Sequence, residues 1–530
     1  MKIAIVCIYP QETVARFLLS GYVLKGYLEK YSEIEGLQVD VLNFGERSKA
    51  ELICEKLRSG GYDMAAYSCY IWNIEKILET VKELRKEGLP VVHVFGGPEI
   101  SAKRIHTFPA DSGADLYIIG EGERKLLNLV ACLRDKEKGC DGELPAGVAV
   151  LRGEELIYTE EGEEDTVQNL DEIPSVYLDH VIEDRLYERQ QVFLETQRGC
   201  RFKCKYCVYH KFVSGIKYYS EGRVIKELGH LIGEKHITAL RFTDSIFTSD
   251  LERGKNIVRY LLELKKKKDV KLPWIYWEFD YNYVDEEFAE LTAKLKNRGD
   301  ILNTDELEPL DRPQLYSDML KDYVVINSIG IESFDENALK GVGRRRVDIG
   351  RFDKFMKMMD SNNLVLKMDL IWGLPFETVE TFFSGLELIV PYLKGADHVL
   401  NIHRLQILPG SELEELTDEY KIEYSREAPH TVYSNNTITR EDLNYTGKLN
   451  SVLSRIVNSP LRSLFFASWE SSGKGLKAFL DDVFGKISSR AETAGIPLVK
   501  EDMIYDSYWN DDIYRDIPSN FLKELLGEYS

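Results

Sequence analysis

The sequence predicts an α/β protein of three parts: a doubly wound N-terminal domain, a parallel barrel that is complete or partial, and a mainly helical C-terminal region. Two patterns support this fold class. Nearly continuous apolar runs alternate with amphipathic stretches over the first 150 residues, and six further strand-then-helix units follow from residue 192. This alternation is typical of parallel sheets covered by helices. In addition, 530 residues exceed what one hydrophobic core usually serves, so several domains are expected.

The first domain is expected over residues 1–150. Its strand candidates are residues 2–9, 37–44, 64–70, 91–97 and 115–123, and its helix candidates are residues 13–31, a stretch from about residue 48, and residues 74–88. A doubly wound sheet binds its ligand outside the carboxyl ends of its strands. Small or turn-forming residues stand at those ends: Tyr9-Pro10, Ser68-Cys69, Gly96-Gly97-Pro98 and Gly120-Glu121-Gly122. Glycine lets the backbone approach a ligand closely, although tight turns without a ligand would use the same residues.

A linker with a small hairpin is expected over residues 151–190, and the barrel over residues 191–411. The barrel strands are predicted at residues 192–197, 239–244, 274–280, 324–333, 365–373 and 401–408. The chemistry of such barrels lies at the carboxyl ends of the strands. Residues 412–530 are helical and aromatic, and we expect them to cap the barrel mouth and to contact the substrate. The aromatic residues in question are Phe465, Phe466, Trp469, Tyr505, Tyr508, Trp509 and Tyr514. The alternative is that these rings build the core of a helical domain.

Composition excludes several classes of function. A net charge of −21 repels polyanions, so nucleic acid is not an expected partner. No apolar run approaches the roughly 20 residues that a membrane-spanning helix needs, and the N-terminal apolar run stops at Pro10, unlike a signal peptide. A cytoplasmic location is expected. The eight cysteines are too few and too scattered for a disulfide scaffold, and only those at positions 200, 204 and 207 are clustered.

The clustered cysteines follow the first predicted barrel strand, in the segment RGCRFKCKYCVYHKF of residues 198–212. A structural zinc site wants four protein ligands, and His210 would be the candidate for the fourth. An iron–sulfur cluster with three cysteine ligands instead leaves one iron open to a substrate, which gives the odd number a purpose. The C-x3-C-x2-C spacing and the position at the barrel mouth favour the cluster.

This spacing, with the aromatic Tyr206 just before the last cysteine, resembles the signature of the radical S-adenosylmethionine (SAM) superfamily. The resemblance implies that Cys200, Cys204 and Cys207 hold a [4Fe-4S] cluster whose open iron binds the amino and carboxylate groups of SAM. It implies that the reduced cluster cleaves SAM to methionine and a 5′-deoxyadenosyl radical, with Tyr206 beside the adenine. An electron donor such as flavodoxin or ferredoxin is the implied partner.

Three later segments resemble SAM-contacting segments of the same superfamily. Asp244, after the second barrel strand, is the implied acceptor for the SAM ammonium group. Glu332 and Ser333 in the segment GIES lie at the position expected near the ribose and carboxylate. Gly373, in the segment IWGLP, stands where the backbone meets adenine. For each segment alone, ordinary barrel architecture remains an alternative.

The N-terminal domain carries GGPEIS at residues 96–101 and ADLYIIGEGE at residues 114–123, ahead of the barrel. This combination resembles the cobalamin-binding class of the superfamily. The implied cobalamin contacts come from the strand ends, at Tyr9, Ser68, Gly96, Gly97, Glu99, Gly120 and Glu121. The D-x-H-x-x-G motif that supplies a lower histidine ligand in many cobalamin domains is missing, since His93 lies within a strand and His106 beyond a later turn. Cobalamin is therefore expected without a histidine ligand from the usual loop, and the alternative is a domain that keeps the fold but has lost the cofactor.

The resemblance implies a cobalamin-dependent radical SAM enzyme, with a methyltransferase acting on an unactivated carbon of a small molecule or peptide as the leading hypothesis. A radical cyclase, rearrangement enzyme or peptide-modifying enzyme without methyl transfer is the second. A non-catalytic cobalamin or metal sensor, with zinc on the cysteines, is the third. The sequence identifies no catalytic side chain that acts on the substrate.

Overall fold

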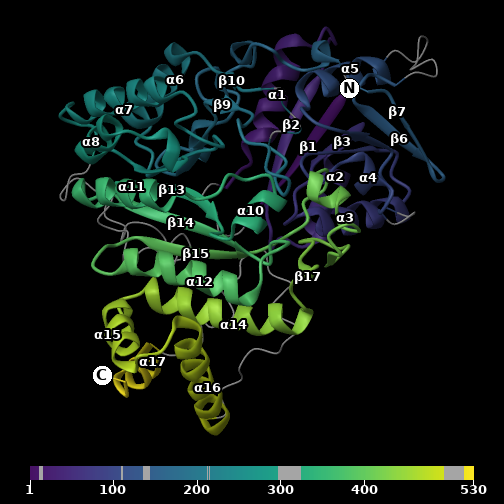
Figure 1. Ribbon diagram of the computed structural model, residues 1–530. Helices are drawn as coiled ribbons and strands as arrows, with labels where there is room; N and C mark the ends of the chain where they lie inside the picture. The colour runs from purple at the N-terminus through teal and green to yellow at the C-terminus, as the bar shows by residue number, and fades with distance from the viewer. Residues whose placement is uncertain are drawn as a thin grey trace.

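The computed structural model describes residues 1–10, 16–108, 112–134, 144–160, 162–209, 211, 213, 215–295, 324–494 and 519–529. Two mainly parallel sheets, each with its own helices, are followed by a group of helices near the C-terminus (Figure 1). The predicted α/β class, with a doubly wound domain, a partial barrel and a helical C-terminal region, is confirmed.

The first sheet has the strand order β2-β1-β3-β4-β5-β6-β7, and its first five strands are parallel. Its elements are β1 (Lys2–Tyr9), α1 (Leu19–Tyr31), β2 (Gln38–Gly45), α2 (Ala50–Gly60), β3 (Met64–Ser68), α3 (Ile74–Lys86), β4 (Val92–Gly96), α4 (Ala102–Ile105), β5 (Leu116–Ile118), α5 (Glu123–Arg134), β6 (Val148–Arg152) and β7 (Glu155–Tyr158). The hairpin β6–β7 pairs antiparallel beside β5, so the sheet extends to Tyr158.

Both faces of this sheet are buried, which explains the continuous apolar runs. In β1, Ala4, Val6 and Ile8 pack on the face that α2 and α3 cover. Ile3, Ile5 and Cys7 pack on the opposite face, together with α1 and α5. Alternate side chains of a strand point to opposite faces, so a strand covered on both sides has no polar positions to spare.

The second sheet has six parallel strands in the order β15-β14-β13-β12-β11-β8, which makes it an open, partial barrel. Its elements are β8 (Gln191–Leu194), β9 (Gln197–Arg198), β10 (Lys217–Tyr218), α6 (Glu221–Leu228), β11 (Ala239–Phe242), α7 (Leu251–Lys265), β12 (Trp274–Glu278), α8 (Glu286–Leu295), β13 (Val325–Glu332), α10 (Glu336–Gly341), α11 (Ile349–Ser361), β14 (Val365–Trp372), α12 (Val379–Ile389) and β15 (Val399–Arg404). β9 and β10 form a separate two-stranded ribbon.

The strands of this barrel have one helix-covered face and one inner face. In β14, Leu366, Met368, Leu370 and Trp372 belong to the large hydrophobic core with the helices. The alternating residues Lys367 and Asp369 face the other way and are only partly buried. The inner face is therefore polar at the middle and carboxyl end of the sheet.

The C-terminal elements are α13 (Glu412–Glu415), β16 (Glu423–Tyr424), β17 (Val432–Ser434), α14 (Arg440–Val457), α15 (Arg462–Ser472), α16 (Leu476–Ala494) and α17 (Ser519–Gly527). α14 packs against β15 and α16, and α16 also contacts α12 (Figure 1). Phe465 and Phe466 are buried in the core, and Trp469 packs against it, so these three rings serve packing. Tyr505, Tyr508, Trp509 and Tyr514 lie outside the described residues. Within the described part of the chain, no helix has both the length and the hydropathy of a membrane span.

Candidate functional site

The cysteine loop begins directly after β9, at the carboxyl end of β8. Gly199 has φ +87° and its Cα lies against the Gly215 carbonyl so closely that a Cβ would collide with it. The Ser245 hydroxyl donates to the Gly199 carbonyl over 2.7 Å. Further along, the Lys205 amide donates to the Val342 carbonyl over 2.9 Å, and the Cys207 amide donates to Cys204 over 3.1 Å. The backbone that carries the three cysteines is thus fixed by contacts from three other segments.

The three thiols lie close enough to influence one another electrostatically. Burial raises the pKa of Cys207 to about 12, and the nearby Cys204 and Cys200 add to this effect. Burial also raises the pKa of the Cys204 thiol, although Arg344, whose Nη1 lies 3.7 Å from its Sγ, opposes it. Thiolates, rather than thiols, bind metal. A cationic metal centre would therefore stabilise the Cys204 and Cys207 sulfurs in the form that this site otherwise disfavours.

Among the described residues, no three His, Cys, Asp or Glu side chains converge closely enough to hold one metal ion. A structural zinc site needs four protein ligands. A [4Fe-4S] cluster held by three cysteines leaves one iron open to a substrate. The preference for the cluster over a single zinc ion stays a prediction from the cysteine spacing. His210, the alternative fourth ligand for zinc, lies outside the described residues.

Glu332 reaches the cysteine loop because of an irregularity in β13. The pairing of β13 with β14 shifts between Gly330 and Glu332, and Glu332 has φ +69°. Such a bulge re-aims a side chain, and a non-glycine residue in this region is strained. The Glu332 carboxylate lies 3.6 Å from Arg344 and hydrogen-bonds Tyr206. Burial raises the pKa of Glu332 and the Arg344 charge opposes it. Arg344 thus interacts with Tyr206, Glu332 and Cys204 together.

The other predicted SAM contacts have partners within the protein. Asp244 is buried and accepts hydrogen bonds from the amides of Thr196 (2.7 Å) and Gln197 (3.1 Å), and burial raises its pKa to about 6. It therefore anchors the strand that leads into the cysteine loop. The Ser333 hydroxyl donates to Glu377. The role of Asp244 and Ser333 toward SAM stays a prediction.

Gly373 follows β14 in a turn where the backbone has φ +94°, a conformation that favours glycine. Its carbonyl accepts from Asn435 over 2.9 Å, and a Cβ would lie 3.1 Å from Leu443. The segment after β17 and the helix α14 therefore hold this turn. Its predicted contact with adenine stays a prediction.

The predicted cobalamin contacts lie together at the carboxyl ends of the parallel strands of the first sheet, which we call the ligand edge. Ser68 pairs with Gly96 across β3 and β4, and Gly96 pairs with Ile118 of β5. Beside them the rings of Tyr70 and Trp72 stack, with centroids 4.3 Å apart and planes 15° apart. Both rings also pack against the hydrophobic core on the α1 and α5 face of the sheet.

Gly97 serves a close backbone approach. It has φ +113°, and a Cβ would lie 2.6 Å from the Cys69 carbonyl oxygen, whereas a Cβ on Gly96 would meet its nearest atom, of Ile118, at 3.6 Å. The glycine at position 97 is thus required by the packing of the β3 and β4 loops. Its contact with cobalamin stays a prediction.

No histidine from the described strand-end loops of the first sheet faces this edge. His93 lies inside β4, is fully buried and hydrogen-bonds the Tyr67 hydroxyl over 2.9 Å. Burial lowers the pKa of His93 to about 4. The expectation that His93 lies within a strand is correct, and its buried position removes it from the ligand edge.

Two glutamates predicted to contact cobalamin form ion pairs with the barrel side of the molecule. Glu121 lies 2.8 Å from Arg198 and 3.2 Å from Lys217, and the same arginine contacts Glu123 at 2.8 Å and Glu195 at 3.0 Å. Arg198 is only two residues before Cys200. The ion pair between Glu121 and Arg198 could not be predicted from the sequence, because the two residues are 77 positions apart.

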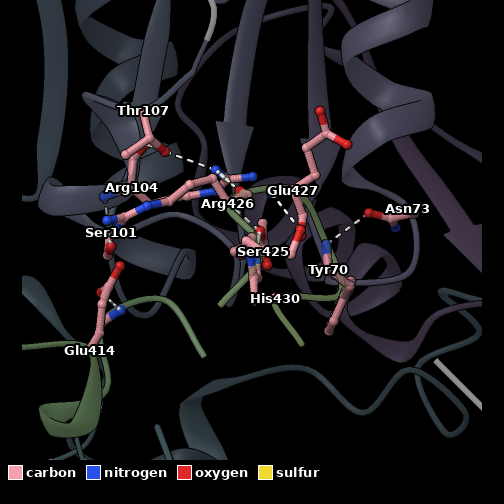
Figure 2. Close-up of polar contacts among 12 residues, drawn as sticks. Tyr70, Asn73, Ser101, Arg104, Thr107, Glu414, Ser425, Arg426, Glu427 and His430 are labelled. Atoms are coloured by element: carbon pink, nitrogen blue, oxygen red, sulfur yellow. Dashed lines mark hydrogen bonds and ion pairs between the residues drawn. The ribbon is translucent and has the colours of Figure 1, made fainter. Parts of the chain in front are cut away.

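The second of these glutamates, Glu99, is buried between Arg104 and a histidine from beyond the barrel. Its Oε1 lies 3.3 Å from Arg104 Nε and 2.6 Å from His430 Nε2. Figure 2 shows Arg104 reaching toward Arg426, beside His430. Direct contact of Glu99 and Glu121 with cobalamin stays a prediction, and their observed partners are side chains of the protein.

Comparisons with known proteins agree with this arrangement. Residues 23–130 match the family described as B12 binding domain. The chain is 24% identical over 394 residues to the cobalamin-dependent radical SAM methyltransferase TokK of Streptomyces tokunonensis, covering 72% of this chain and 52% of TokK. It is 23% identical over 361 residues to the 2-(S-pantetheinyl)-carbapenam-3-carboxylate methyltransferase of Streptantibioticus cattleyicolor, covering 66% of this chain and 48% of that protein. The chain thus spans about half the length of these curated relatives.

Solved structures show the same fold. The radical SAM methyltransferase TsrM from Kitasatospora setae, with cobalamin and a [4Fe-4S] cluster bound, aligns with a TM-score of 0.56 at 15% identity and covers 79% of this chain and 78% of its own. The cobalamin-dependent SAM radical enzyme OxsB aligns with a TM-score of 0.59 at 12% identity and covers 99% of this chain and 79% of its own. The family match, the curated relatives and the shared fold all point to one group: the chain is similar to the radical SAM enzymes that carry a cobalamin-binding domain.

Proposed function

We propose that this protein is a cobalamin-dependent methyltransferase that acts on an unactivated carbon of a small molecule or a peptide. The observation that carries the proposal is the direct link between the two cofactor regions: Arg198, two residues before Cys200, contacts Glu121 at the ligand edge of the first sheet. Methyl transfer by these two cofactors requires both to reach one substrate. The names of TokK and of the carbapenam methyltransferase support methyl transfer over cyclisation.

The residues present fit both cofactors. Cys200, Cys204 and Cys207 would hold the cluster, and the strand ends at Ser68, Gly96 and Gly120 would hold cobalamin. When bound, the cluster would supply reductive cleavage of SAM and cobalamin would supply the methyl group. Arg344 orients Glu332 and stabilises the negative charge of the Cys204 thiolate. Glu332 in turn fixes Tyr206, the predicted neighbour of adenine.

The substrate is proposed to contact the inner face of the barrel. There Asp369 accepts hydrogen bonds from Ser328 (2.8 Å), Lys367 (2.9 Å) and Asn401 (3.0 Å), and His403 Nε2 lies 3.1 Å away. Burial alone would raise the pKa of Asp369, but the Lys367 charge and His403 outweigh it and lower that pKa. An apolar cluster of Tyr276, Ile326, Val365 and Val399 lies beside this polar row, on the amino-terminal side. The row thus presents fixed charges to a polar part of the substrate, on the same face as Glu332.

A labelling experiment tests the methyl transfer. Anaerobically reconstituted protein would receive hydroxocobalamin, a flavodoxin reducing system, SAM with a deuterated methyl group, and a pool of small molecules and peptides from a cytoplasmic extract. A product that gains the deuterated methyl group is expected, and the variant with Cys200, Cys204 and Cys207 all replaced by alanine should neither cleave SAM nor form that product. SAM cleavage accompanied only by unlabelled, dehydrogenated or rearranged products would instead favour the cyclase hypothesis. Loss of all hydroxocobalamin on desalting would contradict methyl transfer.

A further inference from the structure

One segment contacts both cofactor loops. We call residues 405–432, which follow β15, the bridging segment. Its two ends pair with each other, because the Ile407 amide donates to the His430 carbonyl over 3.0 Å and the Val432 amide donates to Leu405 over 3.1 Å. The segment is therefore a closed loop anchored to the barrel, rather than a loose connection to α14.

On one side the bridging segment holds the cysteine loop through Lys205, which stands between Cys204 and Tyr206. The Leu413 amide donates to the Lys205 carbonyl over 2.8 Å. The Lys205 ammonium donates to the Tyr420 hydroxyl over 3.2 Å and lies 3.7 Å from Glu412. Backbone and side chain of Lys205 are both fixed by this segment.

On the other side the bridging segment holds the short helix α4, which follows the loop at the ligand edge of the first sheet. Lys103 donates to the Glu414 carbonyl over 2.7 Å. Arg104 donates to the Arg426 carbonyl over 3.0 Å (Figure 2). Leu413 and Glu414 are adjacent, so consecutive residues bind the cysteine loop and α4. The most buried of these contacts joins Glu99 and His430, whose side chains are 1% and 3% exposed.

His430 makes a polar contact on both sides of its ring. Nε2 lies 2.6 Å from Glu99 Oε1, and Nδ1 lies 3.3 Å from the Ser425 carbonyl oxygen. The same Glu99 oxygen lies 3.3 Å from Arg104 Nε, so one buried carboxylate is shared by the first domain and the bridging segment.

We propose that the bridging segment sets the spacing between the ligand edge of the first sheet and the cysteine loop, and that His430, through its contact with Glu99, is the positioning residue that fastens it. The catalytic consequence rests on the proposed function, whereas the contact exists in the protein without cofactors. Replacing His430 by a side chain without a donor would remove this hydrogen bond to a carboxylate and loosen both loops.

The test compares His430→Leu with His398→Leu. His398 is a matched control because it is also buried and also bonds a carboxylate, that of Asp360 at 2.9 Å, but lies within the barrel. In cofactor-free protein, hydrogen exchange of residues 97–104 and of the segment around Leu413 is measured at one pH and corrected for intrinsic rates. Protection of both regions should be about tenfold lower in His430→Leu than in wild type, the change expected for loss of one such hydrogen bond. His398→Leu should behave as wild type at both regions.

The second readout uses the loaded enzyme. His430→Leu should cleave SAM normally but form about tenfold less methylated product per 5′-deoxyadenosine, because spacing and not cleavage is disturbed. Wild-type exchange protection at both loops in His430→Leu would overturn the proposal. So would a parallel loss of cleavage and product, since that would mean general unfolding. If wild type formed no methylated product, the proposed function would fail while the exchange experiment still decided the positioning.

Discussion

At the residue scale, buried charges explain most of the specific contacts around the site. Arg198 is the clearest case, because one guanidinium that is 12% exposed faces Glu121, Glu123 and Glu195. Replacing it by methionine leaves Glu123 and Glu195 without this cation, while Glu121 keeps Lys217 at 3.2 Å. We expect a loss of about 3–5 kcal/mol in the free energy of unfolding, as found when one partner of a buried pair is removed. Denaturant unfolding measures this change.

The control for this prediction is Arg185→Met. Arg185 also pairs with a glutamate, Glu183, but both side chains are mostly exposed. Surface pairs contribute about 0–1 kcal/mol, so this variant should unfold almost as wild type does. Equal stability losses in the two variants would contradict the importance of the buried arginine.

Glu377 gives a prediction on pH. It is buried, its Oε2 has no hydrogen-bond partner among the described residues, and burial raises its pKa from 4.5 to about 8, with Ser333 opposing the change and Asp335 adding to it. A carboxyl whose pKa is raised in the folded state keeps its proton there while the unfolded chain loses it, so stability falls as pH rises from about 4.5 to about 8. Glu377→Gln does not titrate. Its stability relative to wild type should therefore grow over this range by up to about 5 kcal/mol, and parallel pH curves of the two proteins would argue against it.

At the element scale, the adjacent glycines Gly96 and Gly97 differ in how strongly the packing around them requires glycine. Gly97→Ala should cost about 2 kcal/mol or more, because φ +113° is unfavourable for alanine and its Cβ would meet the Cys69 backbone. Gly96→Ala should cost less than about 1 kcal/mol, since its Cβ has only ordinary contacts. Thermal unfolding of the two variants checks the contrast. If Gly97→Ala unfolded like Gly96→Ala, the close approach to Cys69 would not be a constraint.

The elements themselves were largely predictable from the sequence. The apolar run of residues 2–9 coincides with β1 (Lys2–Tyr9), and the run of residues 365–373 contains β14 (Val365–Trp372), because buried strands carry a strong local signal. The cysteine loop was found from its spacing alone. The partners of Glu99, Glu121 and Asp244 were not, because a carboxylate at a strand end has the same local pattern whether it binds a ligand or a distant arginine.

At the scale of the whole molecule, the C-terminal region packs beside the barrel and also stabilises it through hydrogen bonds. The Asn458 side chain bonds both the amide (3.0 Å) and the carbonyl (2.7 Å) of Leu400 in β15, which gives that strand side-chain partners from the region after α14. Arg404 donates to the Leu443 carbonyl over 2.9 Å. Arg462 donates to carbonyls in the connection before β15, including that of Leu393 at 3.3 Å. The expected substrate cap is thus also a structural support.

These contacts change the outcome expected for truncation after residue 411. A region that only capped the barrel mouth could be removed with the cluster intact. Here its removal would strip β15 of Asn458, expose the core residues Leu400 and Leu405, and take away the Leu413 bond to Lys205 in the cysteine loop. We expect the truncated protein to unfold at a temperature well below that of the full chain and to retain little iron after anaerobic reconstitution, as measured by calorimetry and by iron and sulfide analysis. Removal of residues 495–530 alone takes away α17, whose Leu522, Leu525 and Leu526 pack in the core far along the chain from the cysteine loop, and should lower stability while leaving the iron content near that of the full chain. A protein ending at residue 411 that bound a full cluster would show that the C-terminal region is only a cap.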